Sequence, residues 1–383
     1  MKILYILKHN PWGIGGGCYA CRNYLEAFVE IFKGCDMDVL VCAEYLTHGN
    51  TDEFPNIHFV KVGERKLFDK LLSPLTGEMH RFQSAAIQML RMNDYDFCIF
   101  DHNCIAGTLV DVCKAEGVKT IVLNHNCELE YYRDNHPSLL NRLLLLPVVR
   151  RNEKRAYQCC DFNIVLTKED EELFAQLYGK SETVKVVGGC FMKKGERIDG
   201  TALKPFSRQK LKMVISGTIG NVQNLDGINY FLNELYPCVP KDVDVVIAGK
   251  NPPAELVDRL KEFRNIELIA NPKDMNSVLH DCDIFLCPTR LGGGMKLRVM
   301  DGLRNGMPVI AHVVSARGYS AFSDAEYMFP FSEKEQFKTV LERIIEDIKN
   351  ARISKTAIAE FTALQLDFSV AVKRLTDINI YRR

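Results

Sequence analysis

The chain alternates short apolar runs with longer segments in which apolar residues recur at helical spacing. Runs rich in β-branched and aromatic residues are typical of buried strands, and one-sided apolar patterns are typical of helices. In the first half, the pattern predicts strands at 3–7, 39–42, 58–62, 97–100, 120–123 and 162–166. It predicts helices at 19–32, 81–92, 106–116, 139–158 and 169–177. Such alternation favours a parallel sheet that is covered on both faces.

A second alternation follows the stretch 188–208, in which the periodicity stops. Paired glycines, paired lysines and Pro205 interrupt this stretch, so we interpret it as an interdomain linker. Beyond it the pattern predicts strands at 213–216, 243–248, 266–270, 283–287 and 309–312, helices at 225–235, 253–263 and 275–280, and a helical segment at 331–383. We therefore predict an α/β fold of two Rossmann-like domains, 1–190 and 206–366, that face each other across a cleft. A terminal helix at about 367–383 is predicted to pack back on the first domain.

Composition narrows the class of protein. Of 383 residues, 47% are hydrophobic and 26% are charged, as in soluble globular proteins. Lys+Arg and Asp+Glu are equal at 49 each, so the net charge gives no sign of a nucleic-acid partner. No apolar run is long enough to predict a transmembrane helix. The first strand lacks a small-residue cleavage site, so we do not interpret it as a signal peptide.

The fourteen cysteines are scattered, and most lie inside apolar runs. This usage is typical of reduced core residues in a cytosolic protein. Cys18 and Cys21 have a metal-like or redox-like spacing, but no second pair follows at the distance of a zinc site. We therefore predict a structural use for them and no metal site.

The stretch from Cys287 to His312 has the pattern of a strand, a glycine turn, a helix and a strand. A glycine turn before a helix leaves backbone N–H groups that bind phosphate well. Lys296 and Arg298 add positive charge there, and Asp301 is placed to accept hydrogen bonds from sugar hydroxyls. The alternatives are an ordinary tight turn with solvated basic residues, and an Asp301 that only pairs with Lys296 or Arg298 on the helix surface.

The first domain has its own candidate residues. Glycines at 15–17 would let a phosphate approach the backbone. His125 and His102 each follow a predicted strand, which places them at the carboxyl edge of the sheet where such folds bind ligands. Asp101 and Glu128 are further candidates for a catalytic base. The alternative for His125 is an ordinary loop histidine with satisfied hydrogen bonds.

Several motifs together resemble one family. The segment 211–218, followed by Asn224, resembles the opening of the donor domain of GT-B glycosyltransferases, and is closest to the retaining group 1 set often called family 4. The segment 244–250 is similar to that family's second donor-domain strand. Gly292-Gly293-Gly294-Met295-Lys296-Leu297-Arg298-Val299-Met300-Asp301 resembles its donor-site motif.

The first domain carries the same resemblance. The segment 13–17 is similar to the family's glycine-rich first loop, and His125-Asn126-x-Glu128 resembles its HN-x-E segment. Two departures stand out. Gly293 occupies a position where the family often has an acid, and the basic pair common after the first donor-domain strand is absent, with Gly220 and Asn224 near those places.

The resemblance implies a retaining, metal-independent glycosyltransferase whose substrate is a nucleotide-sugar donor and which requires no cofactor. It implies a role at the reacting centre for His125, with His102, Asp101 and Glu128 as further candidates. It implies donor-binding roles for Gly15, Gly16, Gly17, Ser216, Gly217, Thr218, Asn224, Ala270, Asn271, Gly293, Gly294, Met295, Lys296, Leu297, Arg298 and Asp301. The proposed product is a surface polysaccharide or glycoconjugate, with a saccharide or lipid-linked acceptor.

The stretch 138–155 joins an apolar block to a basic cluster. One interpretation is a membrane-surface element, which places a cytoplasmic protein at the inner face of the membrane. The other is a buried helix with a solvated basic end. Pro147 should bend or interrupt the helix in either case.

Two other functions remain open. A protein of the same fold that binds nucleotide sugar without transferring it would fit Gly293 and the missing basic pair. A dinucleotide oxidoreductase would use the glycines at 13–17 with Glu44 as the ribose acid. The segment 8–12, however, puts those glycines too far beyond the first strand for the usual fingerprint.

Overall fold

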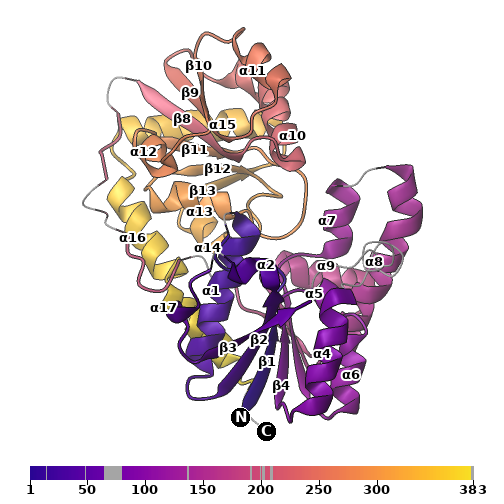
Figure 1. The fold of residues 1–383 in the computed structure, drawn as a ribbon. Coiled ribbons are helices and arrows are strands. Elements are labelled where there is room, and N and C mark those ends of the chain that lie inside the picture. The colour runs from indigo at the N-terminus through magenta and orange to yellow at the C-terminus, as the bar shows by residue number, and fades with distance from the viewer. Residues whose placement is uncertain are drawn as a thin grey trace. The chain divides into compact units, whose positions relative to one another are not determined.

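The computed structural model describes residues 1–13, 15–47, 49–63, 80–135, 138–189, 192–198, 200, 203–207 and 210–380. The chain divides into two compact units (Figure 1). Unit 1 consists of Met1–Lys194 with Phe368–Arg383, and unit 2 consists of Gly195–Asp367. Each unit is built on one sheet whose strands all pair in parallel.

The sheet of unit 1 has the strand order β3-β2-β1-β4-β5-β6-β7. Its strands are β1 (Lys2–Ile6), β2 (Asp36–Cys42), β3 (Ile57–Val62), β4 (Phe97–Phe100), β5 (Lys119–Asn124), β6 (Phe162–Val165) and β7 (Val184–Val186). Its helices are α1 (Gly16–Ile31), α2 (Ala43–Leu46), α4 (His80–Met92), α5 (Asn103–Ala106), α6 (Leu109–Ala115), α7 (Glu128–Asn135), α8 (Leu139–Cys159), α9 (Lys168–Tyr178) and α17 (Phe368–Asp377), with a short 3₁₀ turn at Thr51–Glu53.

Strand β1 lies inside the sheet of unit 1, between β2 and β4, and its residues pack on both faces of the sheet. Leu4 and Ile6 belong to the core formed with α4 and α6, whereas the ring of Tyr5 contacts Phe28 of α1. The chain runs outward from β1 to β3 and then returns to β4 on the other side of β1. The strand order therefore reverses between β1 and β4, and ligands of such sheets bind beyond the carboxyl ends of the strands at this point.

The sheet of unit 2 has the order β10-β9-β8-β11-β12-β13 and reverses between β8 and β11. Its strands are β8 (Leu211–Thr218), β9 (Val243–Lys250), β10 (Ile266–Ala270), β11 (Ile284–Cys287), β12 (Val309–His312) and β13 (Met328–Phe331). Its helices are α10 (Val222–Tyr230), which continues as a π-helical turn at Phe231–Leu235 and a 3₁₀ turn at Tyr236–Cys238, then α11 (Ala254–Leu260), α12 (Met275–His280), α13 (Leu297–Arg304), α14 (Ser320–Asp324), α15 (Lys334–Lys349) and α16 (Lys355–Leu366).

Strand β7 and helices α2, α5 and α14 have no counterpart in the pattern-based prediction, and three other elements also depart from it. The segment predicted to be helical from 331 begins at the end of strand β13, which contains Pro330. β13 is an edge strand, and proline is tolerated at a sheet edge because one side needs no backbone donor. Helix α8 continues through Pro147 without interruption. Helix α7 was not predicted because its sequence is almost entirely polar.

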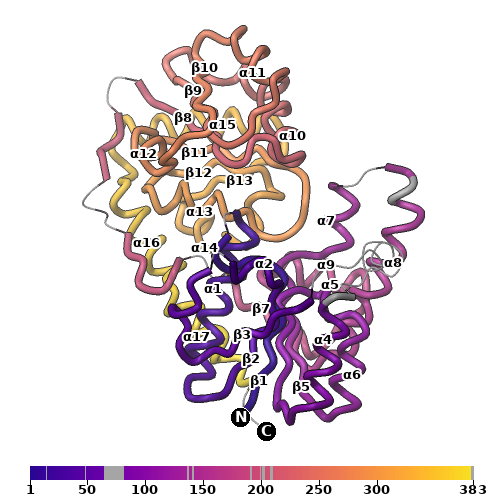
Figure 2. Tube along the Cα trace, viewed as in Figure 1, coloured from indigo at the N-terminus to yellow at the C-terminus, as the bar shows by residue number. Residues whose placement is uncertain are grey.

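The C-terminal helix α17 packs against α1 in unit 1, as the chain trace shows (Figure 2). Its buried residues are Phe368, Ala371 and Leu375, which recur at helical spacing on one face. Within the described part of the chain, none of the helices has both the length and the apolar character needed to cross a membrane.

Candidate active site

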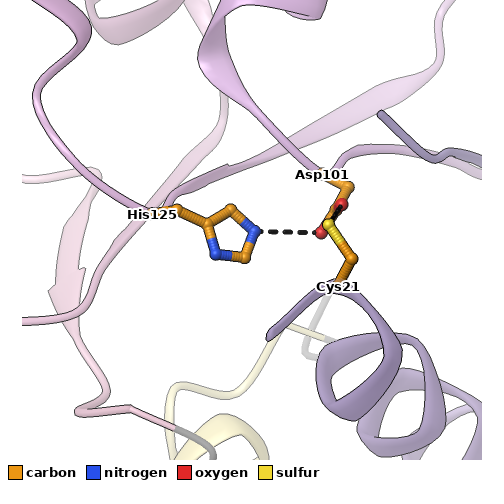
Figure 3. Close-up of side chains that lie close together, drawn as sticks. All are labelled: Cys21, Asp101 and His125. Atoms are coloured by element: carbon orange, nitrogen blue, oxygen red, sulfur yellow. Dashed lines mark hydrogen bonds and ion pairs between the residues drawn. The ribbon is translucent and has the colours of Figure 1, made fainter. Parts of the chain in front are cut away.

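Asp101 is the centre of a buried polar cluster at the carboxyl edge of the unit 1 sheet. It follows β4 directly and is fully buried. Its Oδ1 accepts a hydrogen bond from the hydroxyl of Tyr5 (3.2 Å) and lies 3.1 Å from Nε2 of His125. Its Oδ2 accepts from the thiol of Cys21 at 2.5 Å (Figure 3). Burial alone would raise the pKa of Asp101, but the contact with His125 lowers it, so the group is a carboxylate.

A second carboxylate lies beside the first cluster. Glu128, the first residue of α7, has its Oε1 3.0 Å from Nδ1 of His102 and 3.5 Å from Nζ of Lys8. Burial would raise the pKa of Glu128, but the Lys8 ammonium and the contact with His102 lower it to about 2. Burial and the same ammonium lower the pKa of His102 to about 3. The site therefore holds an ionised glutamate beside a neutral imidazole.

The histidines are arranged face to face and edge to face. The rings of His102 and His125 are stacked, with 4.6 Å between centroids, and His9 meets His102 edge-on at 5.4 Å. Tyr24 of α1 presents its ring edge-on to His125 at 5.5 Å. Burial lowers the pKa of His9 to about 4, and the nearby Lys8 ammonium adds to this effect. The three imidazoles thus form a continuous polar surface at the ends of β1, β4 and β5.

Glu153 of α8 holds the start of helix α7, and with it Glu128, in place. Its Oε1 accepts from the backbone N–H of Glu128 (2.6 Å) and from the amide of Asn103 (2.9 Å), and its Oε2 accepts from the hydroxyl of Tyr178 (2.6 Å). A carboxylate at the first N–H groups of a helix caps that helix. Burial raises the pKa of Glu153 to about 7. The position of Glu128 therefore depends on a group on a different helix.

The glycines predicted to bind the donor in unit 1 begin helix α1. Gly15 is its N-cap residue, and Gly16 and Gly17 are its first two residues. All three glycines are exposed, and the N-cap residue has no side chain to cap the first N–H groups of α1. The ring of His9 lies over Gly17, where an added Cβ would come within 3.2 Å of it. The loop therefore brings an uncapped helix N-terminus next to the histidine cluster.

In unit 2, the glycine turn precedes α13, and Lys296 organises it. Gly292 and Gly294 have φ values of 82° and 66°, a conformation that favours glycine. Lys296 is the N-cap residue of α13 and is buried. Its ammonium lies 3.1 Å from the carbonyl oxygen of Gly292, 3.2 Å from that of Gly293 and 3.3 Å from Oε1 of Gln223. The ammonium of Lys296 therefore binds carbonyl groups of the turn. The sequence predicted that it binds a phosphate.

A pocket opens beside this turn. It is lined by Ile215, Ser216, Gly217, Ile219, Asn224, Ile228, Pro288, Thr289 and Arg298. Arg298 lies so close to Gly217 that an added Cβ there would come within 3.2 Å of Nη1. Asn224 donates to the carbonyl oxygen of Thr218 at 2.7 Å, and its buried Oδ1 has no hydrogen-bond partner among the described residues. This oxygen is therefore available to accept a hydrogen bond from a bound ligand or a water molecule.

The remaining predicted donor residues fall into two groups. Met295 packs against Gly318, Leu297 begins α13, and Asp301 lies half-buried one turn along that helix. Burial raises the pKa of Asp301 to about 6, despite the nearby guanidinium groups of Arg304 and Arg298. Ala270 and Asn271, in contrast, lie at the end of the edge strand β10. Strands β9 and β8 separate them from the glycine turn.

Sequence reasoning did not single out several residues that the structure places at these sites. They are Tyr5, Lys8, His9, Cys21, Glu153, Gln223 and Thr289. Lys8 and His9 directly follow β1, so the rule that selected His102 and His125 would also have selected them. Tyr5 and Glu153 have no such signal, because each is one polar group within a buried or helical pattern.

Comparison with known proteins places these features in a family context. The family model described as glycosyl transferases group 1 matches residues 213–347, which contain β8, the pocket and the glycine turn. An uncharacterized 44.6 kDa protein from the cps region of Klebsiella pneumoniae is 28% identical over 123 residues. That match covers 30% of this chain and about a third (32%) of the length of the relative.

Solved structures match the chain over nearly its whole length. HepE from Anabaena, in complex with UDP, aligns with a TM-score of 0.65 and 11% identity over 99% of both chains. Sucrose-phosphate synthase from Thermosynechococcus elongatus aligns with a TM-score of 0.70 and 12% identity over 99% of this chain and 98% of that one. WaaG, a glycosyltransferase involved in lipopolysaccharide biosynthesis, aligns with a TM-score of 0.64 and 14% identity over 99% and 100%.

Two parallel-sheet α/β units of this kind define the GT-B fold, and the predicted fold class is confirmed. The resemblance to group 1 glycosyltransferases is confirmed as well, because the family model matches residues 213–347 of unit 2.

Proposed function

We propose that the protein is a glycosyltransferase that moves a sugar from a nucleotide-sugar donor to a saccharide or lipid-linked acceptor. The observation that carries this proposal is the pocket of unit 2, where Arg298, the unpartnered Oδ1 of Asn224 and the N-terminus of α13 surround one space. A nucleoside diphosphate carries both the negative charge and the hydrogen-bond donors that would match these groups. Its phosphate oxygens suit the guanidinium and the helix N-terminus, and its hydroxyl groups suit the open acceptors.

The proposed donor is a UDP-sugar. HepE has been solved with UDP and with UDP-glucose. In this chain Asp301 would accept from the ribose diol. Ala270 and Asn271 would contact the base through backbone groups. Negative charge develops on the diphosphate as the glycosidic bond breaks, and Arg298 with the uncapped end of α13 would stabilise it. These groups perform the electrostatic work that a divalent ion performs elsewhere, so we propose transfer without a metal.

Transfer is proposed to proceed with retention. The bond between the anomeric carbon and the diphosphate oxygen breaks, and the acceptor oxygen bonds to that carbon on the same face. The acceptor proton passes to the leaving diphosphate, so no separate base is needed. His125 would contact the donor sugar at the reacting centre, held by the Asp101 carboxylate. Gly15, Gly16 and Gly17 would admit the donor phosphate to the backbone.

The first half of helix α8 supports a lipid-linked acceptor at the inner face of a membrane. Leu139, Leu143 and Leu144 are 73%, 65% and 61% exposed. The exposed basic residues of the same helix are Arg142, Arg150, Arg151, Lys154 and Arg155. Exposed leucines with neighbouring basic side chains suit an anionic lipid surface. We therefore propose a cytoplasmic, peripheral enzyme of surface polysaccharide or glycolipid synthesis, which agrees with the cps-region relative.

A donor panel tests the proposed reaction. The full chain is incubated with UDP-, GDP- and ADP-sugars, each with and without EDTA, and nucleotide release is followed with and without membrane extract as the acceptor source. One donor should turn over, at a rate that EDTA does not lower. Tight nucleotide binding without turnover of any donor would instead support the alternative function, a nucleotide-sugar-binding protein without transferase activity.

Vesicle sedimentation tests the membrane contact separately. The double variant Leu143→Glu, Leu144→Glu should lose binding to anionic vesicles, while nucleotide binding is retained. Leu364→Glu is the matched control, because Leu364 is 71% exposed on helix α16 of unit 2. Equal binding by the double variant, the control and the wild-type chain would contradict the membrane contact.

A further inference from the structure

We infer that Cys21, Asp101 and His125 form a binding site for a thiophilic divalent cation of the Zn²⁺ class. One ligand atom from each residue, the thiol sulfur, a carboxylate oxygen and a ring nitrogen, lie within 4.8 Å of one another (Figure 3). The residues come from α1, from the end of β4 and from the end of β5. A thiolate, an imidazole and a carboxylate are the three ligand types that zinc binds in proteins.

The charge of the cluster favours a cation. Asp101 is fully buried, and its contacts are the hydroxyl of Tyr5, the thiol of Cys21 and the ring of His125. Among the described residues, neither a lysine nor an arginine forms an ion pair with it. A buried carboxylate without such a partner is unfavourable. Zn²⁺ bound to one thiolate, one carboxylate and one neutral imidazole gives a site of zero net charge, which suits a buried position.

A neighbouring cluster provides an internal contrast. His102, Cys104 and Glu128 also bring three metal-type ligand atoms within 4.8 Å. That cluster already contains a cation, because the Lys8 ammonium lies 3.5 Å from Glu128 and hydrogen bonds to Cys104. A metal ion there would meet the charge of Lys8 at short range. The two clusters have the same ligand types, and only the one around Asp101 lacks a side-chain ammonium.

Residues around the cluster would support the bound ion. Tyr5 donates to the carboxylate, as outer groups commonly do to metal ligands. The backbone N–H of His9 points at the sulfur of Cys21, and such a donor stabilises a thiolate. Cysteine binds a metal ion as a thiolate, so binding displaces the thiol proton. Binding then forms a sulfur–metal bond and releases the thiol proton to solvent, while His125 binds through Nε2 with its own proton on Nδ1.

This inference does not depend on glycosyl transfer, because binding of the ion is measured without any sugar substrate. It has a consequence for the proposed function, however. An ion bound between Asp101 and Nε2 of His125 replaces the contact by which Asp101 holds the imidazole that is proposed to meet the donor sugar. Zn²⁺ would therefore act on the proposed enzyme as an inhibitor, and transfer itself remains a reaction without a metal.

Cobalt substitution tests the site. The full chain is made metal-free with EDTA, and Co²⁺ is added as the probe. We expect one Co²⁺ per chain, a near-ultraviolet sulfur-to-cobalt charge-transfer absorption, and displacement of that ion by Zn²⁺. Cys21→Ser should abolish the sulfur absorption, and Tyr5→Phe should weaken the affinity by about 10- to 100-fold. Cys104→Ser, in the neighbouring cluster, is the matched control and should leave both the absorption and the affinity unchanged.

Three results would overturn the inference. They are a wild-type chain that binds Co²⁺ without the sulfur absorption or does not bind it, an absorption that persists in Cys21→Ser, and an absorption that is lost in Cys104→Ser. The first is measured on the wild-type chain, so it is decisive even where a variant fails to fold. Circular dichroism of each variant separates loss of the ion from loss of the fold.

Discussion

The imidazole rings of His102 and His125 stack with 4.6 Å between their centroids and 28° between their planes. Each ring is held by a different carboxylate, His125 by Asp101 and His102 by Glu128. The two rings follow adjacent strands, β4 and β5, so the stack joins the ends of the sheet where its ligand should bind. Neither ring can turn without disturbing the other.

This stack predicts unequal effects when each histidine is replaced. His125→Ala should lower kcat by about 100-fold or more, because His125 is the proposed contact with the donor sugar. His102→Ala should lower kcat less, because His102 acts through the stack. Steady-state kinetics with the donor found by the panel measures both values. The reverse order of effects would assign the sugar contact to His102.

Replacing Arg298 or Lys296 should separate donor binding from support of the turn. Arg298→Ala should weaken nucleotide diphosphate binding by about 10- to 100-fold, the value of a hydrogen bond to a charged group, with little loss of stability. Lys296→Ala should also weaken donor use, and it should lower the free energy of unfolding by about 1 to 3 kcal/mol, because it removes the donor to two loop carbonyl groups.

Calorimetric titration and urea unfolding of both variants provide the measurements. Donor kinetics that are unchanged in both variants would show that the phosphate is held elsewhere in the chain. A Lys296→Ala variant with reduced donor binding and unchanged stability would contradict the role of Lys296 as a support for the turn.

Asp301 predicts a pH-dependent stability. Burial raises its pKa to about 6, above the value of an unfolded aspartate. The folded protein therefore holds this proton more tightly, and its contribution to the free energy of unfolding falls as pH rises from about 4 to about 6. Above pH 6 the ionised group costs roughly 2 to 3 kcal/mol. Asp301→Asn should be more stable than the wild-type chain at pH 8, with the advantage gone near pH 4.

Urea unfolding at both pH values measures this difference. The same substitution should weaken nucleotide binding, because it replaces the charged acceptor proposed for the ribose diol with a neutral amide. An Asp301→Asn variant that is no more stable at pH 8 would show that the carboxylate is better compensated than its surroundings indicate.

Gly293 predicts an altered donor preference. Its two neighbours have positive φ values, but Gly293 does not, so its φ angle does not require glycine. Gly293→Glu should leave stability nearly unchanged and shift the kcat/KM ratio between two donor sugars by about tenfold or more. Gly294→Ala is the comparison, since its φ of 66° should cost about 1 kcal/mol of stability. An unchanged donor ratio in Gly293→Glu would place the sugar away from this turn.

The fold was largely predictable because its signals are local. Apolar runs gave β1, β4 and β11 to within one or two residues, and their alternation with helices implied parallel sheets. Strand β13 was missed because Pro330 disguises an edge strand, and α7 was missed because its polar sequence has no apolar face. Helix α7 is capped by Glu153, which lies 25 residues beyond Glu128 and is therefore not a local signal.

The candidate sites were less predictable because their contacts are not local. Residues that follow a strand, such as His102 and His125, could be proposed from strand positions alone. The contact of Cys21 with Asp101 spans 80 residues and requires the strand order to be known. Lys296 could be proposed as a donor-site residue from the sequence, but its contacts with the carbonyl groups of the turn and with Gln223, which comes from another element, could not be predicted.

Helix α8 joins two features that the sequence presented as separate. It is a single helix through Pro147, with the exposed Leu143 near one end and the buried Glu153 about 15 Å further along the helix axis. Glu153 in turn holds the start of α7 and thereby Glu128, the carboxylate that contacts His102. The exposed leucines and Glu153 therefore belong to one continuous helix. If the proposed membrane contact is made at the exposed leucines, it is therefore linked through one helix to the carboxylate that caps α7, and so to the geometry of the histidines.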